Sequence, residues 1–407
     1  MSSPETRRRL CIDFGTSNTV AAFRIGLAEP VLVPLSGGAS ASMPSAVFAD
    51  GDILLVGQAA VHRRLLRPDA YEESPKSRIT DVEIELGERY WEVTEVIGAV
   101  LAHVCQTARR YAGIGDFDSV ILTHPDDWSE RRRAILRESA RRGGIRREQI
   151  RTASESLAAA WYYVFRGHDV VGAERMCVFD FGGGTCDVAV LVHDGNGGFV
   201  VTGSGGDNGL GGRDLDARLQ RWVFDEVAHL DPALVPQLQD PASRLTLADN
   251  VRRAKEALSE SAQAVVDLPG TGRSLLLTRR EFDEMIGDVV GRAVELTREA
   301  IARADTVTDG VAGPVAVYLT GGTSSIPAIQ AAMSQVGRVA RLGDPKTVVA
   351  QGGLLRSTNV EVPGPPGVVA AVGAVPAQLV GRTADRVSTP QGTVHGSAAA
   401  AGRRIVV

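Results

Sequence analysis

Two short turns combine glycine with aspartate in a way that suits phosphate chemistry. They are IDFGTSN at residues 12–18 and FDFGGGTCD at residues 179–187. Backbone N–H groups in such a turn can surround an anion, and glycine removes the Cβ that would keep a ligand away. Magnesium is commonly reached through one or two carboxylates. Either turn alone could be only a tight hairpin, but two of them at matching places could hold a triphosphate and its magnesium ion from both sides.

A third segment, VYLTGGTSSIPAIQ at residues 317–330, has the pattern of a strand, two glycines and a helix. Gly321 and Gly322 would let a ligand approach the backbone, and the N-terminus of the helix favours negative charge. The sequence contains no GxxxxGK[ST] motif and no convincing GxGxxG after a strand, so the sites that those motifs mark are not supported.

The elements around these turns alternate between strands and helices. Apolar runs at 10–14 and 19–23 predict a hairpin around the first turn, and a second hairpin is expected at 176–203. Further strands are expected at 119–123, 264–268, 274–278 and 315–320. Helical spacing is found at 95–112, from about 129, and at 155–166, 213–230, 243–262, 279–303, 326–336 and 345–358. Both halves open with strand, Asp, glycine turn and strand, which indicates an internal duplication of an α/β unit.

Composition narrows the class of protein. The 407 residues carry a formal net charge of −5, so no general basic field favours nucleic acid. Arginines at 131–147 are interleaved with glutamates, which favours a solvated helix face over a nucleic-acid patch. Four cysteines (Cys11, Cys105, Cys177 and Cys186) form no CxxC pair and are expected to be buried thiols in a reducing compartment. No signal core or membrane-length apolar run is found, so we expect a cytoplasmic protein without a membrane partner.

Taken in order, these segments resemble the actin-fold ATPases, and within them the nucleotide-binding domain of the 70-kilodalton heat-shock (DnaK-like) chaperones. IDFGTSNTV and FDFGGGTCDVAVL resemble the two phosphate loops of that family, and MPSAVFADGDILLVGQAA resembles the strands after the first loop. SESLAAAWYY resembles the family's NEPTAAAIAY, and GGDNGLGGRDLDARL resembles GDTHLGGEDFDNRL. The resemblance covers about residues 10–355. It implies a two-lobed, actin-like (ribonuclease H-like) α/β fold that binds ATP with Mg²⁺.

The resemblance also implies a domain plan. The first lobe would span residues 1–170, and the second lobe 171–345, with a smaller subdomain at about 213–305. A return helix to the first lobe is expected at 346–360. The change in composition after VPGPPG predicts a flexible tail over 361–407.

Residue roles follow from the same resemblance, position by position. The catalytic residues would be Lys76, Glu155, Asp180 and Thr185. The magnesium shell would involve Asp13, Asp180 and Asp187, mostly through water. The nucleotide would be bound by Gly15, Thr16, Ser17, Gly182, Gly183, Gly184, Gly211, Gly212, Lys255, Ser259, Gly321 and Gly322. Lys76 alone would be taken for a solvated surface lysine; only its position in the resemblance gives it a role.

The adenosine end departs from the family pattern. In RRAKEALS, Arg252 stands where the family has Glu, and Glu256 stands where it has an arginine that stacks on adenine. Ser325 replaces the second stacking arginine. The sequence therefore predicts weaker ATP affinity than in a typical chaperone ATPase, together with an i,i+4 ion pair between Arg252 and Glu256.

Two further departures concern the rest of the family's mechanism. Ser156 replaces a proline that the family uses to link nucleotide and substrate domains, so that coupling is in doubt. No strand pattern of a peptide-binding sandwich follows residue 360, so direct peptide clamping by this chain is unsupported.

Three functions remain open at this point. The first is a slow Mg²⁺-dependent ATP hydrolase whose lobes close over the nucleotide and act on a protein partner or client. The second is a non-catalytic, nucleotide-gated scaffold. The third is a small-molecule kinase of the same fold, with actin-like filament formation as a lesser option. GGDNGLGGRDLDARL argues against the kinase.

Overall fold

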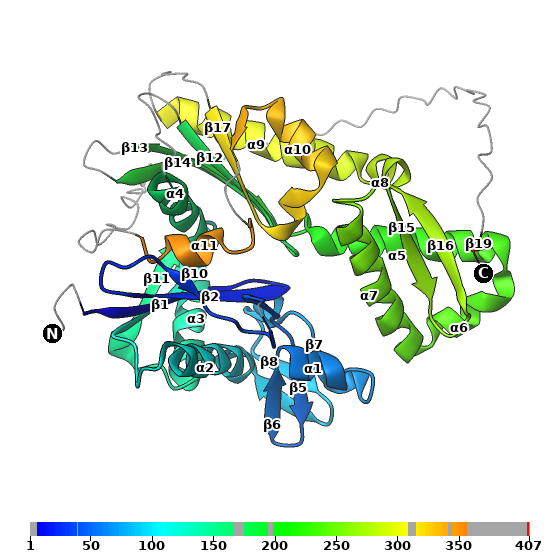
Figure 1. Ribbon diagram of the computed structural model, residues 1–407, viewed down its shortest axis with the longest axis horizontal. Coiled ribbons are helices and arrows are strands. Elements are labelled where there is room, and N and C mark those ends of the chain that lie inside the picture. The colour runs from blue at the N-terminus through cyan, green and yellow to red at the C-terminus, as the bar shows by residue number, and fades with distance from the viewer. Residues whose placement is uncertain are drawn as a thin grey trace, which may run out of the picture. The chain divides into compact units, whose positions relative to one another are not determined.

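The computed structural model describes residues 6–38, 40–166, 175–193, 198–307, 315–340 and 344–355, and the backbone of 405–406. The chain divides into a compact unit, made of residues 1–356 with 405–407, and a second unit at 357–404. The compact unit holds every described residue, and these residues are drawn in colour in Figure 1. Most of the tail expected at 361–407 lies outside the described residues; Ile405–Val406 (β19) pairs with strand β16.

The first half is built on a sheet with the strand order β11-β10-β1-β2-β3, with β4 also paired to β2. Its strands are β1 (Arg8–Phe14), β2 (Asn18–Ile25), β3 (Val31–Leu32), β4 (Ser42–Pro44), β10 (Ser119–His124) and β11 (Ile150–Ser154). β1 and β2 form the expected hairpin, and β10 and β11 run parallel to β1. The apolar side of helix α2 (Val93–Ala112) packs into the same core as β1, with Val96 and Leu101 fully buried.

The second half repeats this arrangement in a sheet with the order β14-β13-β12-β17-β18. Its strands are β12 (Arg175–Phe181), β13 (Cys186–His193), β14 (Phe199–Asp207), β17 (Val315–Thr320) and β18 (Arg338–Ala340). β12 and β13 are antiparallel, while β17 lies parallel to β12 as β10 lies parallel to β1. The duplicated α/β pattern expected from the two glycine turns is therefore confirmed.

Smaller elements extend each half (Figure 1). The first half adds β5 (Val47–Asp50), β6 (Ile53–Val56), α1 (Gln58–Arg63), β7 (Tyr71–Glu72), β8 (Glu83–Leu86), β9 (Arg89–Glu92) and α3 (Glu130–Arg142). The second half adds α5 (Gly212–Leu230), α6 (Val235–Gln239), α7 (Pro241–Ala257), β15 (Gln263–Leu268), β16 (Arg273–Thr278) and α10 (Pro327–Ser334). Two helices meet at the middle of the unit, α4 (Glu155–Phe165) and the fully buried α11 (Val348–Gly352); a Cβ on Gly352 would overlap the Ala158 carbonyl of α4.

Some predicted helices have other limits in the structure. The helix expected at 279–303 is two helices, α8 (Arg279–Met285) and α9 (Gly287–Val307). Ile286 between them has left the helical ψ range, and a capping box between Thr278 and Glu281 begins α8. The helix expected at 243–262 begins at Pro241, because Asp240 caps the N–H groups of the first turn, and it ends at Ala257. Within the described part of 345–358, only Val348–Gly352 is α-helical.

Two expectations from composition can be compared with the structure, and the burial of the cysteines is confirmed. All four cysteines are free and buried, and burial raises the pKa of Cys105 and that of Cys177 to about 12. The arginines of α3 pair with acids: Arg137 with Glu130, and Arg141 with Glu138 at 2.6 Å. This pairing fits a solvated helix face. Among the described residues, no helix combines the length and apolarity that a bilayer crossing needs.

Candidate active site

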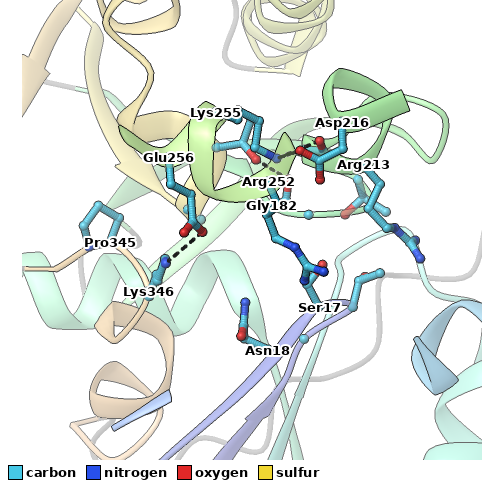
Figure 2. Close-up of a pocket in the computed structure, with 18 of the residues that line it drawn as sticks. Ser17, Asn18, Gly182, Arg213, Asp216, Arg252, Lys255, Glu256, Pro345 and Lys346 are labelled. Atoms are coloured by element: carbon cyan, nitrogen blue, oxygen red, sulfur yellow. Dashed lines mark hydrogen bonds and ion pairs between the residues drawn. The ribbon is translucent and has the colours of Figure 1, made fainter. Parts of the chain in front are cut away.

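A cavity of about 300 Å³ lies where the three glycine turns meet (Figure 2). The first turn contributes Asp13, Gly15, Thr16 and Ser17, and the second contributes Asp180, Gly182, Gly183 and Thr185. Gly321 and Gly322 come from the third turn. The turns were predicted separately from the sequence, and the structure brings all three to one space.

The turns meet closely because each glycine, which has no Cβ, leaves room for another segment of the same chain. A Cβ on Gly183 would overlap the Ser17 hydroxyl, and one on Gly184 would lie 2.6 Å from the Thr16 methyl group. Gly321 adopts a φ of 78°, which side-chain residues rarely take, and a Cβ there would lie 2.5 Å from Asp180 Oδ1. The glycines therefore set the distance between the first and second turns.

Hydrogen bonds fix the second turn to its neighbours. The Gly182 carbonyl accepts from Thr323 Oγ1 at 2.7 Å and from the Gly212 N–H at 3.0 Å. The Arg213 N–H donates to the Gly183 carbonyl at 2.8 Å. Gly211 must approach in the same way, since a Cβ there would lie 2.6 Å from the Gly184 carbonyl carbon. The start of α5 is thus tied to the turn.

A buried ion pair joins two distant parts of the first half. Lys76 Nζ donates to Glu155 Oε1 at 3.0 Å, and the two side chains are only 10% and 11% exposed. Ser74 precedes the short helix of Lys76 and donates to the Thr16 carbonyl at 2.7 Å, which holds Lys76 beside the first turn. Glu155 is the first residue of α4, whose N-terminus is capped by Ser154.

Three aspartates crowd this ion pair. Desolvation and the nearby Glu155 raise the pKa of Asp13 to about 7, although Thr123 Oγ1 donates to Asp13 at 2.9 Å. The same causes raise the pKa of Asp187 to about 7, and that of Asp180 well above its ordinary value. Burial alone would lower the pKa of Lys76, but the attraction of Glu155 and Asp13 raises it overall. One lysine faces four acids, and the raised pKa values of the three aspartates mean that this excess of acidic charge is partly relieved by protonation.

This charge excess fits a bound divalent cation. Magnesium prefers oxygen ligands and keeps several waters, so it does not need a closed set of protein ligands. Within the described ranges, no three His, Cys, Asp or Glu side chains converge closely enough to hold a metal by themselves. The donor set of Asp13, Asp180 and Asp187 therefore suits Mg²⁺ bound partly through water and phosphate oxygens.

Asp187 lies in a second cavity of about 170 Å³, which shares Glu155 and Asp180 with the first. Asp126 also lines it and accepts from Ser154 Oγ at 2.6 Å, while Ser154 and Ser156 lie 3.0 Å apart through their hydroxyls. Sequence reasoning missed Asp126. The signal was present: HPDD follows β10, whose carboxyl end lies beside Asp13 because β10 is parallel to β1.

Most predicted site residues line the first cavity. They are Asp13, Gly15, Thr16, Ser17, Lys76, Glu155, Asp180, Gly182, Gly183, Thr185, Gly212, Lys255, Ser259, Gly321 and Gly322. Asp187 lines the second cavity, whereas Gly184 and Gly211 line neither and instead pack against each other.

The far end of the first cavity is formed by α7 and the segment before α11. Lys255 pairs with Asp216 at 2.7 Å and donates to the Gly212 carbonyl at 2.8 Å. The expected Arg252–Glu256 pair is wrong: Arg252 pairs with Glu73 at 3.0 Å, and Glu256 pairs with Lys346 at 3.8 Å. The physical reason is competition, since oppositely charged side chains from outside the helix reach each of them.

Three contacts join the two halves around the cavity. They are the Arg252–Glu73 pair, an ion pair between Arg64 and Asp249, and a 2.8 Å hydrogen bond from Arg213 to Ser77 Oγ. All three connect α5 or α7 with the segment between α1 and Arg78.

A protein-family model described as "Hsp70 protein" matches residues 70–358, more than half of the chain. The matched range contains Lys76, Glu155 and the second and third glycine turns, while the first turn lies before it.

Proposed function

The chain belongs to the Hsp70 family of actin-like ATPases, and from this premise we propose that it hydrolyses ATP slowly with Mg²⁺ and closes its lobes over the nucleotide. The observation that supports this most is the buried Lys76–Glu155 pair, which lies at the same cavity as all three glycine turns. A binding site alone would not need two opposite charges held away from water at the phosphate end.

Each group has a role in this proposal. The backbone N–H groups of the turns, with Thr16 and Ser17, bind the phosphates. Lys76 stabilises the charge that develops on the transferring phosphoryl group. Glu155, held in place by its ion pair with Lys76, orients the attacking water, and Thr185 lines the same space. Asp13, Asp180 and Asp187 would hold Mg²⁺, which neutralises phosphate charge when bound.

We place ATP affinity below that of a typical chaperone ATPase. The two guanidinium planes of the family pattern are absent at positions 256 and 325, and stacking on a base contributes about 1–3 kcal/mol. A calorimetric titration that gives sub-micromolar affinity with normal adenine selectivity would contradict this part of the proposal.

In this proposal, the ATP cycle drives closure of the lobes, and a protein partner or client binds differently to the open and closed forms. The three contacts that join the halves around the cavity support this, because each is a polar contact between side chains that water at least partly reaches, so it can break and re-form.

The experiment is steady-state phosphate release from Mg·ATP by the full chain and by Glu155→Ala and Thr185→Ala. We expect both variants to lose turnover by about 100-fold or more, with nucleotide still bound. Arg280→Ala, which alters a 78% exposed side chain on α8, is the matched control and should retain wild-type turnover. ATP binding without turnover above background would favour a nucleotide-gated scaffold, and phosphate transfer to an added sugar or acid would favour a kinase.

A further inference from the structure

Lysine is rare in this chain and is confined to one place. Of its 44 lysine and arginine residues, only three are lysines: Lys76, Lys255 and Lys346. All three line the first cavity. All the other basic residues of these 44 are arginines, so lysine occurs in this chain only where a ligand would lie.

Lysine and arginine differ in what they can bind. An ammonium group is a compact point charge on a flexible stem, whereas guanidinium is a wide planar fork. Two of the lysines have clear tasks in the structure, Lys76 in the pair with Glu155 and Lys255 in the contacts with Asp216 and the Gly212 carbonyl. Lys346 was not singled out by the sequence motifs. It lines the cavity, so the question is which part of a ligand it contacts.

The backbone around Lys346 is fixed. The Pro345 carbonyl accepts from Thr320 Oγ1 at 3.1 Å and from the Gly321 N–H at 3.4 Å, which ties it to the third turn. The Lys346 N–H donates to Asp344 Oδ1 at 3.0 Å. The stem passes over Gly322, where a Cβ would lie 3.0 Å from Lys346 Cε. These contacts fix the backbone of Lys346 and start its side chain over Gly322, at the edge of the cavity.

The ammonium group points across the end of the cavity towards α7. Among the described residues, its ion-pair partner is Glu256 Oε1 at 3.8 Å, a long contact between side chains that are 42% and 58% exposed (Figure 2). A pair this exposed and long contributes little by itself, so it costs little to rearrange around a ligand. Lys346 is therefore a pre-positioned cation whose partner can give way.

We propose that Lys346 binds the purine ring of the nucleoside triphosphate, and that its weak ion pair with Glu256 rearranges when the ring binds; this inference rests on the proposed function. Phosphates bound at the glycine turns would leave the nucleoside in the rest of this cavity, where Glu256, Ser259 and Lys346 are among the lining residues. Arg252, the other cation on this side, is already paired with Asp249 at 3.1 Å and with Glu73. No aromatic side chain is found among the described residues that line the cavity, so a cation over the ring face is the available contact.

The first test compares two ligands on the full chain, Mg·ATP and inorganic tripolyphosphate with Mg²⁺, by calorimetry. Lys346→Ala should weaken ATP binding about five- to thirtyfold and leave tripolyphosphate binding within about twofold. Lys346→Arg should stay within about threefold of the wild type for ATP, since guanidinium also covers a ring face. Arg280→Ala serves as the exposed control, and thermal melting checks that each variant is folded.

The outcomes separate this inference from the proposed function. Equal losses for both ligands would make Lys346 a phosphate contact and overturn the inference, as would unchanged ATP binding. Either result would leave ATP hydrolysis standing if the wild type turns over ATP. A wild-type protein that binds neither ligand would overturn both.

A second test uses the rarity of lysine directly. Protein labelled with ¹⁵N-lysine has only three backbone amide signals from lysine, one for each residue, and each is assigned by its Lys→Arg variant. Adenosine alone should shift the Lys346 signal and leave that of Lys76 in place, and tripolyphosphate with Mg²⁺ should do the reverse. An adenosine titration that moves Lys76 but not Lys346 would overturn the proposal.

Discussion

The two ends of the cavity are built differently, as two lysine–glutamate pairs show. Lys76 and Glu155 meet at 3.0 Å with side chains about one-tenth exposed, whereas Lys346 and Glu256 meet at 3.8 Å with side chains 42% and 58% exposed. The phosphate end is closed and held by glycine contacts and buried charge. The base end is open, and its charges lie where water screens them.

This difference shows where sequence change is tolerated. A buried charge left without its partner costs about 3–5 kcal/mol, so neither Lys76 nor Glu155 can be replaced alone at little cost. An exposed pair contributes about 0–1 kcal/mol, so the base end can exchange residues freely. The phosphate turns keep their family pattern and the adenosine end does not, which is the outcome that this difference predicts.

The largest expected effect is that of Gly211→Ala at the phosphate end. A Cβ there would lie 2.6–2.7 Å from the Gly184 backbone. Neither backbone segment can shift to relieve this contact without moving the second turn. We expect loss of detectable ATP binding in a calorimetric titration. Gly291→Ala in α9 meets nothing within 4 Å and should instead stabilise the protein by about 0.5–1 kcal/mol. Wild-type ATP affinity in Gly211→Ala would show that the turns do not need this close approach.

Asp126→Ala should have the next largest effect, because Asp126 accepts from Ser154, the residue that caps the helix of Glu155. We expect turnover to fall about tenfold with KM unchanged, together with a loss of about 1–2 kcal/mol of stability. Arg280→Ala, which alters a 78% exposed side chain on α8, is the control. A change in KM rather than in kcat would mean that Asp126 acts on binding and not on the position of Glu155.

A smaller effect is the pH dependence of Mg·ATP binding. Asp13 and Asp187 have pKa values of about 7 in the free protein, so both are partly protonated at neutral pH. A cation favours the ionised carboxylates, so its binding should release protons, and affinity should fall as pH decreases through 7. Calorimetry at pH 7 in buffers of different ionisation enthalpy measures this release. Proton uptake would contradict the placement of Mg²⁺ beside these acids.

Sequence and structure agree best where the chemistry is local. The residues of each glycine turn follow one another in the chain, so their types and spacing predict the turn directly. The expected hairpin around IDFGTSN and the strand at 315–320 were therefore confirmed. By contrast, the Lys76–Glu155 contact joins residues 79 positions apart, and only the resemblance to a family suggested a role for both.

The errors also have a physical pattern. The Arg252–Glu256 prediction considered one helix alone, but Glu73 and Lys346 come from distant segments and reach these side chains instead. The break at Ile286 was missed because the apolar spacing continues across it. Asp126 was missed because it follows a strand and not a glycine turn. The count of lysines, visible from the start, would have pointed to Lys346.

The most direct measurement compares Lys76→Ala and Lys346→Ala in one steady-state ATPase assay, with kcat and KM determined separately and folding checked by thermal melting. We predict that Lys76→Ala lowers kcat by about 100-fold or more. Lys346→Ala should raise KM by about five- to thirtyfold and keep kcat within about threefold of the wild type. Equal losses of kcat in both variants, or wild-type kcat in Lys76→Ala, would contradict a catalytic phosphate end and a separate base-binding end.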